Sequence, residues 1–146
     1  MIDKVRIQMK LVELRKRVKL LEKHFKSLPE EKLILDETLY AAAERHLEVA
    51  IQSCMDIGTH IIAQLGLDRP KKENREIFII LAKAQILPLE FARKLATMVG
   101  YRNILVHEYT EVERHYTYEN IQENLGDFAR FAKYIEQFLQ EKSKKL

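Results

Sequence analysis

The chain has 146 residues, 47% of them hydrophobic, and its 25 basic residues nearly balance 22 acidic ones, for a net charge of +3. This length and hydrophobic content predict one domain over residues 1–146 with a buried core, ending in a basic tail at about 142–146 that we expect to be disordered. A net charge this small does not by itself indicate a nucleic-acid-binding protein.

The composition favours neither a membrane protein nor a disulfide-bonded one. The longest apolar run, Ile77 to Ala82, is far shorter than the roughly 20 residues that a membrane-spanning helix needs, and the first residues lack the apolar region of a signal peptide. The single cysteine, Cys54, can form no internal disulfide and no four-thiolate metal site, so we interpret it as a core residue. We expect a cytoplasmic protein that does not contact membranes and uses no metal or cofactor.

Apolar residues spaced three and four positions apart predict two long helices in the first half of the chain. The first stripe runs from Ile7 to Phe25, on a helix of about 25 residues that ends at Ser27-Leu28-Pro29. After a short connector, Asp36 can cap the second helix with its carboxylate, and Gly66 is well placed to end that helix in the left-handed conformation. Residues 68–70 then form a turn.

The second half of the chain predicts three further helical segments. Residues 74–84 have apolar side chains at helical spacing, and Pro88 fits the first position of the next helix because its missing N–H is not needed there. Gly100 either ends or kinks that helix. The last helix covers about residues 117–142, with an apolar side that includes Ile121, Leu125 and Phe128.

Long amphipathic helices joined by short connections are typical of an up-and-down bundle. Only four glycines, three prolines and no long alternation of polar and apolar residues argue against strands. We therefore predict an all-α fold, an antiparallel bundle of four main helices with one short inserted helix. A bundle does not imply a function, which has to be argued from particular side chains.

Residues 102–109, RNILVHEY, bring a guanidinium, an imidazole and a phenol together within eight positions, in the form Arg-x4-His-x-Tyr. Side chains of these types could act on a phosphodiester. Cleavage of RNA without a metal, for example, needs a base for the ribose 2′-OH proton, an acid for the leaving 5′ oxygen and a cation for the charge on phosphorus. Arginine binds phosphate through two N–H groups and stays charged. Histidine, with an ordinary pKa of about 6.5, can serve as base or as acid near neutral pH.

The spacing of Arg102 and His107 limits what one copy of this segment can do. On a regular helix the two side chains project about 140° apart. Their convergence on one phosphate needs the long reach of arginine, a break at Gly100, or a second copy of the motif across a symmetric interface. A two-fold homodimer would supply two histidines, one as base and one as acid, with two arginines around the phosphate.

The motif resembles the signature of the HepT-type HEPN ribonuclease toxins of prokaryotic toxin–antitoxin pairs. The resemblance covers nearly the whole chain, including Glu44-Arg45 in the second helix and the LATMVGYRN run at 95–103 that leads into the motif. One departure is Gln85, where many relatives have glycine, which puts the geometry of that loop in doubt. The resemblance implies an HEPN-like domain and a homodimeric, metal-independent endoribonuclease that leaves a 2′,3′-cyclic phosphate on one RNA product.

The same resemblance implies a role for each motif residue. Arg102 and His107 would be the catalytic pair, and Asn103 would position the phosphate or the imidazole. Arg45 and Asp56 would support the cleft, Asp56 by orienting Arg102. For Asn103 a plain helix cap remains an alternative.

Tyr109 has a separate implied role, as the site of inactivation. In HepT-type pairs a minimal nucleotidyltransferase antitoxin of the MntA type transfers AMP to this tyrosine, and the added charged nucleotide would block the RNA site. A core-edge aromatic residue is the alternative for Tyr109. For the whole protein, the alternative is a non-catalytic helical adaptor that binds a nucleotidyltransferase or presents a nucleotide to it.

A metal site remains a weak alternative in the second helix. Asp56 and His60 are four residues apart on one helical face and His46 lies ten residues before Asp56, but carboxylate–histidine pairs are common in bundles. We assign no role to His24 and His115.

Overall fold

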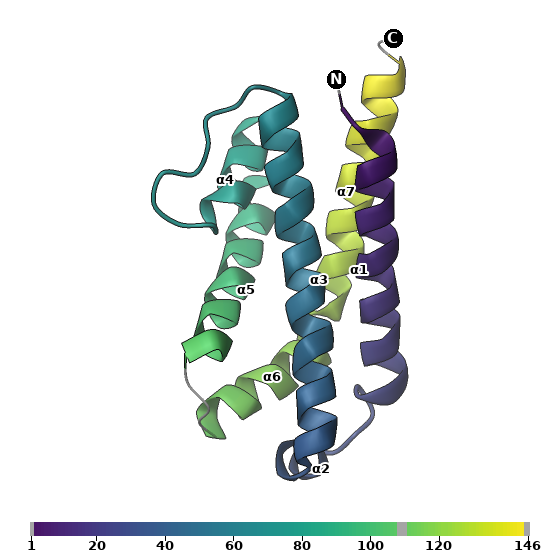
Figure 1. Cartoon of the computed structure of the whole chain (residues 1–146), viewed down its shortest axis with the longest axis vertical. Helices are drawn as coiled ribbons and strands as arrows, with labels where there is room; N and C mark the ends of the chain where they lie inside the picture. Colours follow the sequence, from purple (N-terminus) through teal and green to yellow (C-terminus); the bar gives the residue numbers. More distant parts are fainter. Residues whose placement is uncertain (1, 108–110, 145–146) are drawn as a thin grey trace.

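The computed structural model describes the backbone of residues 2–107 and 111–144, and the side chains of residues 2–100 and 113–142. The long helices run along the long axis of the molecule, and shorter ones lie at its lower end (Figure 1). Over the described residues there are seven helices and no strand: α1 (Lys4–His24), α2 (Glu30–Leu35), α3 (Glu37–Gln64), α4 (Glu76–Lys83), α5 (Leu89–His107), α6 (Glu111–Glu123) and α7 (Leu125–Lys144).

The predicted all-α bundle is confirmed, and the apolar stripe of the first helix is buried as expected. α1 packs along α3 in the opposite direction, because Lys10 binds Asp56 at 3.1 Å whereas Arg17, farther along α1, contacts the earlier His46 at 3.1 Å. The buried residues of α1 recur every three or four positions: Ile7, Leu11, Leu14, Val18 and Leu21. Burial of such a stripe, rather than helix propensity, stabilises a helix of this kind.

The number of short helices was underestimated. The expected connector before Asp36 contains α2, which begins after Pro29, has Glu30 and Glu31 in its first turn and buries Leu33. Acidic residues are favourable at a helix N-terminus, and besides the buried Leu33, Arg114 of α6 contacts α2 by donating to the carbonyl of Ile34 at 2.7 Å. A single buried residue produces no periodicity, so the pattern did not reveal this helix.

The single helix predicted for residues 117–142 was also wrong, because the chain forms α6 and α7 with a break at Asn124. Here the Asn124 amide group donates to the side-chain oxygen of Asn120 at 2.7 Å. α6 packs against α2 and α7 against α1, so the break redirects the chain between two partners. Ile121 and Leu125 are buried on either side of it, and therefore the apolar spacing continued through the break.

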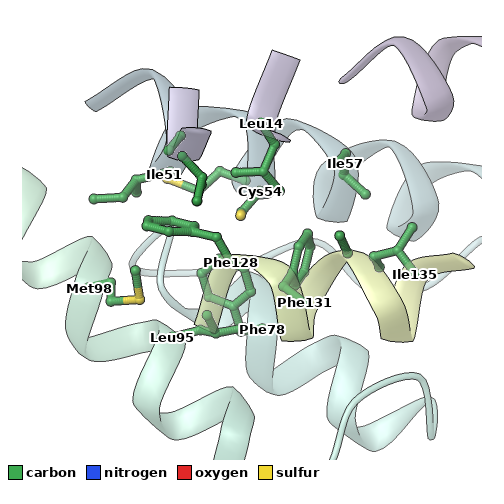
Figure 2. Close-up of a cluster of buried hydrophobic side chains, with 14 of the residues drawn as sticks. Leu14, Ile51, Cys54, Ile57, Phe78, Leu95, Met98, Phe128, Phe131 and Ile135 are labelled. Carbon is green, nitrogen blue, oxygen red and sulfur yellow. The ribbon is translucent and has the colours of Figure 1, made fainter. Parts of the chain in front are cut away.

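One hydrophobic core joins side chains from all seven described helices, and Figure 2 shows the part of it where α3, α4, α5 and α7 meet. Phe78 of α4 meets Phe131 of α7 edge to face, with ring centroids 6.0 Å apart, a favoured geometry for aromatic pairs. Cys54 is free and buried, as predicted. A Cβ atom on Gly58 would lie 2.4 Å from the Cγ2 of Ile77, so glycine is what lets α4 approach α3 here.

The helix ends at Asp36 and Gly66 match the predictions. The carboxylate of Asp36 accepts hydrogen bonds from the N–H groups of Thr38 and Leu39 at 3.0 and 3.1 Å. Gly66 has φ +68°, and Leu67 donates its N–H to the carbonyl of Ile62 at 2.9 Å. This is the pattern of a helix ended by a left-handed residue.

Gln85 ends α4 in the same way, although it is not glycine. Its φ is +63°, and the following N–H, of Ile86, donates to the carbonyl of Leu81 at 2.9 Å. A side chain in this left-handed region costs roughly 1–2 kcal/mol. The departure noted at Gln85 thus falls at a position where glycine is the less strained residue.

Helix α5 is continuous from Leu89 to His107, so of the two alternatives predicted for Gly100, an end or a kink, the end is wrong. Pro88 lies one residue before the helix, and its carbonyl accepts the N–H of Ala92 at 2.9 Å. The buried Met98 and Val99 next to Gly100 explain the continuity, since packing outweighs the roughly 1 kcal/mol that glycine costs inside a helix.

In the described part of the chain, no helix combines the length and apolarity needed to cross a membrane.

The replacement Gln85→Gly should raise the free energy of unfolding by about 1 kcal/mol, because it relieves the strain of a left-handed glutamine. Urea unfolding followed by circular dichroism measures this as a higher midpoint with an unchanged slope. The matched control is Gly66→Ala, which should lower the unfolding free energy by a similar amount. A lower stability for Gln85→Gly would contradict the assigned strain.

Candidate functional site

The motif lies in the last two turns of α5. Arg102, Asn103 and His107 belong to this helix, and Tyr109 lies outside the described residues. Because α5 continues through Gly100, a helix end at that position no longer explains how one copy of the motif could converge. The long reach of Arg102 and a second copy of the motif are the two explanations that remain for the angle of about 140°.

Helix α6, which follows the motif, is fastened to α3 and α2 by polar contacts. The hydroxyl groups of Tyr40 and Thr117 are 3.0 Å apart in a buried hydrogen bond. Arg114 donates to the carbonyl of Ile34 at 2.7 Å and to the carboxylate of Glu37 at 2.8 Å, and its guanidinium lies 4.5 Å from the centre of the Tyr40 ring. These contacts hold the chain segment just after the motif against the lower end of the bundle.

Carboxyl groups gather where α3 and α6 meet. Burial raises the pKa of Glu44, and the nearby carboxylates of Glu48 and Glu113 raise it further, whereas Arg114 acts in the opposite direction. Glu113 itself is only 4% exposed. Burial also raises the pKa of the Tyr40 phenol. This end of the bundle therefore gathers partly buried carboxyl groups of α3 and α6 around Arg114.

Two of the predicted supporting residues, Arg45 and Asp56, lie on α3. Arg45 is largely exposed and lies 3.9 Å from Glu48. The carboxylate of Asp56 already accepts hydrogen bonds from Lys10 at 3.1 Å and from Gln52 at 2.8 Å. A role for Asp56 in orienting Arg102 stays a prediction, because the Arg102 side chain is outside the described part.

The imagined metal site does not assemble around Asp56. His46 contacts Arg17, and burial together with this cation lowers the pKa of its imidazole. His60 lines a groove of about 420 Å³ between α1 and α3 with Lys10 and Asp56. Among the residues that the structure describes, no three histidine, cysteine or carboxylate side chains are grouped so that they could hold a metal ion.

Tyr40 and Arg114 were not singled out from the sequence, and Glu44 was named only in the Glu44-Arg45 pair of the resemblance, without a role of its own. Tyr40 and Glu44 are four positions apart and so share a face of α3, which is a recognisable local signal. Arg114 gave no such signal, because its partner Glu37 is 77 positions away. Only the folded chain brings this arginine to α3.

Comparisons with known proteins bear on the family and the fold of the chain. A family model described as "Ribonuclease HepT-like" matches residues 14–135, which include the motif. An "mRNA nuclease HepT" of Shewanella oneidensis is 33% identical over 96 residues, which are 66% of this chain and 71% of that protein. A "tRNA nuclease HepT" of Aphanizomenon flos-aquae is 34% identical over 96 residues, 66% of this chain and 65% of that protein.

A solved structure similar to the chain is the tri-AMPylated HEPN toxin of Shewanella oneidensis in complex with an MNT antitoxin. It superimposes with a TM-score of 0.81 at 27% sequence identity, over 90% of this chain and 96% of that one. The similarity thus extends well beyond the segment around the motif.

Proposed function

We propose that this chain, which belongs to the ribonuclease HepT-like family, is the toxin of a toxin–antitoxin pair and a metal-independent endoribonuclease. The observation that carries the proposal is the Arg-x4-His-x-Tyr segment, residues 102–109, located in the residues that the family model matches and at the end of α5. The relatives named as mRNA and tRNA nucleases support RNA as the substrate.

The proposed reaction is an internal transesterification. One His107 takes the proton of the ribose 2′-OH, and the 2′ oxygen attacks the adjacent phosphorus. The bond from phosphorus to the 5′ oxygen breaks as a second, protonated His107 gives its proton to that oxygen. The products are a 2′,3′-cyclic phosphate and a free 5′-hydroxyl, so no water or oxidant is consumed.

A homodimer supplies the two histidines that this reaction needs. Each chain has one motif histidine, and the angle between Arg102 and His107 favours sharing of the site across a two-fold axis. Arg102 of each chain would bind the phosphate and stabilise the charge that develops on it. Asn103 would orient the phosphate or the imidazole, and Arg45 and Asp56 would support the cleft from α3.

AMP transfer to Tyr109 is the proposed means of silencing. The phenol oxygen of Tyr109 would attack the α-phosphorus of ATP bound to an MntA-type nucleotidyltransferase, and pyrophosphate would leave. The product places a phosphodiester and a nucleoside two residues from His107, which would repel and obstruct the RNA backbone. The AMPylated toxin–antitoxin complex with the same fold supports this mode of regulation.

Purified chain should cut single-stranded RNA in the presence of EDTA, and His107→Ala or Arg102→Ala should lower the rate by at least about 100-fold, the usual effect of losing a general acid–base group or a charge-stabilising group. Gel analysis of a labelled RNA measures the rates. The control is His24→Ala, which alters a histidine outside the motif and should cut normally. Full activity of either motif variant, with helicity preserved, would contradict the mechanism.

Incubation of the purified chain with its cognate nucleotidyltransferase and ATP should add AMP to Tyr109 and stop RNA cleavage by the chain. Intact-mass measurement and peptide mapping locate the modification, and Tyr109→Phe should remain unmodified and active while the antitoxin is present. Modification without loss of cleavage would contradict silencing by AMP. It would favour the adaptor interpretation if the unmodified chain also failed to cut.

A further inference from the structure

Helix α1 has an apolar stripe on its outward face. Val5, Met9 and Val12 are four and three positions apart and so share one face of the helix, and their exposed fractions are 71%, 69% and 65%. The buried residues Ile7 and Leu14 project from the opposite side of the helix. Figure 1 shows α1 at the edge of the bundle, with α3 and α7 on its inner side. The stripe therefore faces away from the rest of the chain.

The grouping of these three side chains distinguishes them from other apolar residues on the surface. The other large hydrophobic side chains that are exposed in the described part of the chain, Leu35, Leu89 and Tyr116, lie on three different helices. Apolar residues scattered singly on a surface are ordinary, whereas a contiguous apolar patch marks a site of interaction. The stripe of α1 is thus a candidate docking surface.

The same line along α1 becomes basic after Val12. It continues through Lys16, Lys19 and Lys23, which are all exposed. If a second copy of the helix lay parallel to the first, each lysine would face its own counterpart, and like charges facing each other disfavour binding. An antiparallel copy avoids this repulsion.

One antiparallel register brings all the apolar side chains of the stripe together. With a two-fold axis just before Met9, Val5 lies level with the partner's Val12, and Met9 lies almost level with the partner's Met9. The partner helix begins at its Lys4, which is then level with residue 13. The three lysines lie beyond that point, so they face solvent rather than the partner helix. This register explains why the outward line is apolar in the first half of α1 and basic in the second.

Charged side chains beside the stripe favour the same register. Arg6 and Glu13 border the stripe on the side of α1 that faces α3, where Arg6 lines the groove and Glu13 accepts a hydrogen bond from Arg17 at 2.9 Å. That hydrogen bond lowers the pKa of the Glu13 carboxyl, so this group is charged near neutral pH. A two-fold axis brings the same flank of both helices together. Arg6 is then within about 3 Å, along the helix axis, of the level of the partner's Glu13, and the reverse pair forms by symmetry.

The other flank of the stripe opposes the contact only weakly. There Lys4 lies near the partner's Arg15, but Arg15 already donates to Glu136 of α7 at 2.7 Å, which offsets its charge. The contact covers about three turns of each helix and is smaller than the interface of a permanent dimer. We therefore expect a weak, reversible association.

We propose that the outward face of α1 is a docking surface for a second copy of this chain, in which two α1 helices pack antiparallel through Val5, Met9 and Val12, with Arg6 of each chain bound to the partner's Glu13. The contact does not rest on the function proposed above. It lies in the first half of α1, whereas the motif lies at the other end of the bundle (Figure 1). A chain that also pairs through its motif would form assemblies larger than a dimer.

Cysteine cross-linking measures the register of this contact in the full chain. In Met9→Cys the two thiols would lie about 1.5 Å apart along helices whose axes are about 8–10 Å apart, so a short bis-maleimide should join two chains. Lys19→Cys is the matched control, because its two copies would lie about 31 Å apart along the helices and should not be joined. The unaltered chain should give no cross-linked dimer, since its one cysteine, Cys54, is buried.

An exchange of charges tests the antiparallel orientation. In the Met9→Cys chain, Arg6→Glu would place two carboxylates together and should lower the yield of cross-linked dimer about tenfold. The additional change Glu13→Arg restores opposite charges across the contact and should recover most of the yield. These residues lie outside the hydrophobic core, and circular dichroism checks that each variant keeps its helicity.

The absence of a cross-link in folded Met9→Cys would overturn the proposal. Equal cross-linking of Met9→Cys and Lys19→Cys would also overturn it, because a parallel pair or random collision joins both positions. A yield that stays low after the charge exchange would reject the pairing of Arg6 with Glu13. Binding of the unaltered chain to vesicles of anionic lipid, with no cross-link in Met9→Cys, would reject the self-contact and assign the stripe to a membrane surface.

Discussion

The packing of α3 against the other six described helices is the constraint on which the rest of the molecule depends. This helix buries residues along its whole length, and Gly58 removes the side chain that would keep α4 away from it. The approach of α4 matters because α4 leads directly into α5, whose last turns carry the motif. The position of Arg102 and His107 is thus set by contacts made two helices earlier in the chain.

The lower end of α3 acts in a second way, through polar rather than apolar side chains. Tyr40 and Arg114 fasten α6 so that the chain leaving the motif turns back under the bundle. This closure partly buries Glu44 beside Glu113. Carboxyl groups of α3 and α6 thus lie together at this end of the bundle.

Much of this fold could be predicted from the sequence, because long buried stripes have a clear period. The helix from Ile7, the cap at Asp36 and the left-handed end at Gly66 all follow from local rules. Helix α2 and the break at Asn124 could not be predicted in this way. Helix α2 buries a single residue, and the break interrupts an apolar stripe whose spacing continues on both sides of it. The motif was visible because its chemistry is contiguous, whereas the site around Arg114 depends on residues far apart in the chain.

The central claim is that the ribose 2′-OH of the substrate attacks its own phosphate at a site built from Arg102 and His107. Mass spectrometry of the 3′ ends of the RNA fragments, made in EDTA, tests this claim most directly. The account predicts a 2′,3′-cyclic phosphate on the upstream fragment, a 5′-hydroxyl on the downstream one, and no cutting where a 2′-deoxyribose replaces the attacking ribose. A 3′-hydroxyl with a 5′-phosphate would contradict it, because those ends require attack by water from outside the substrate.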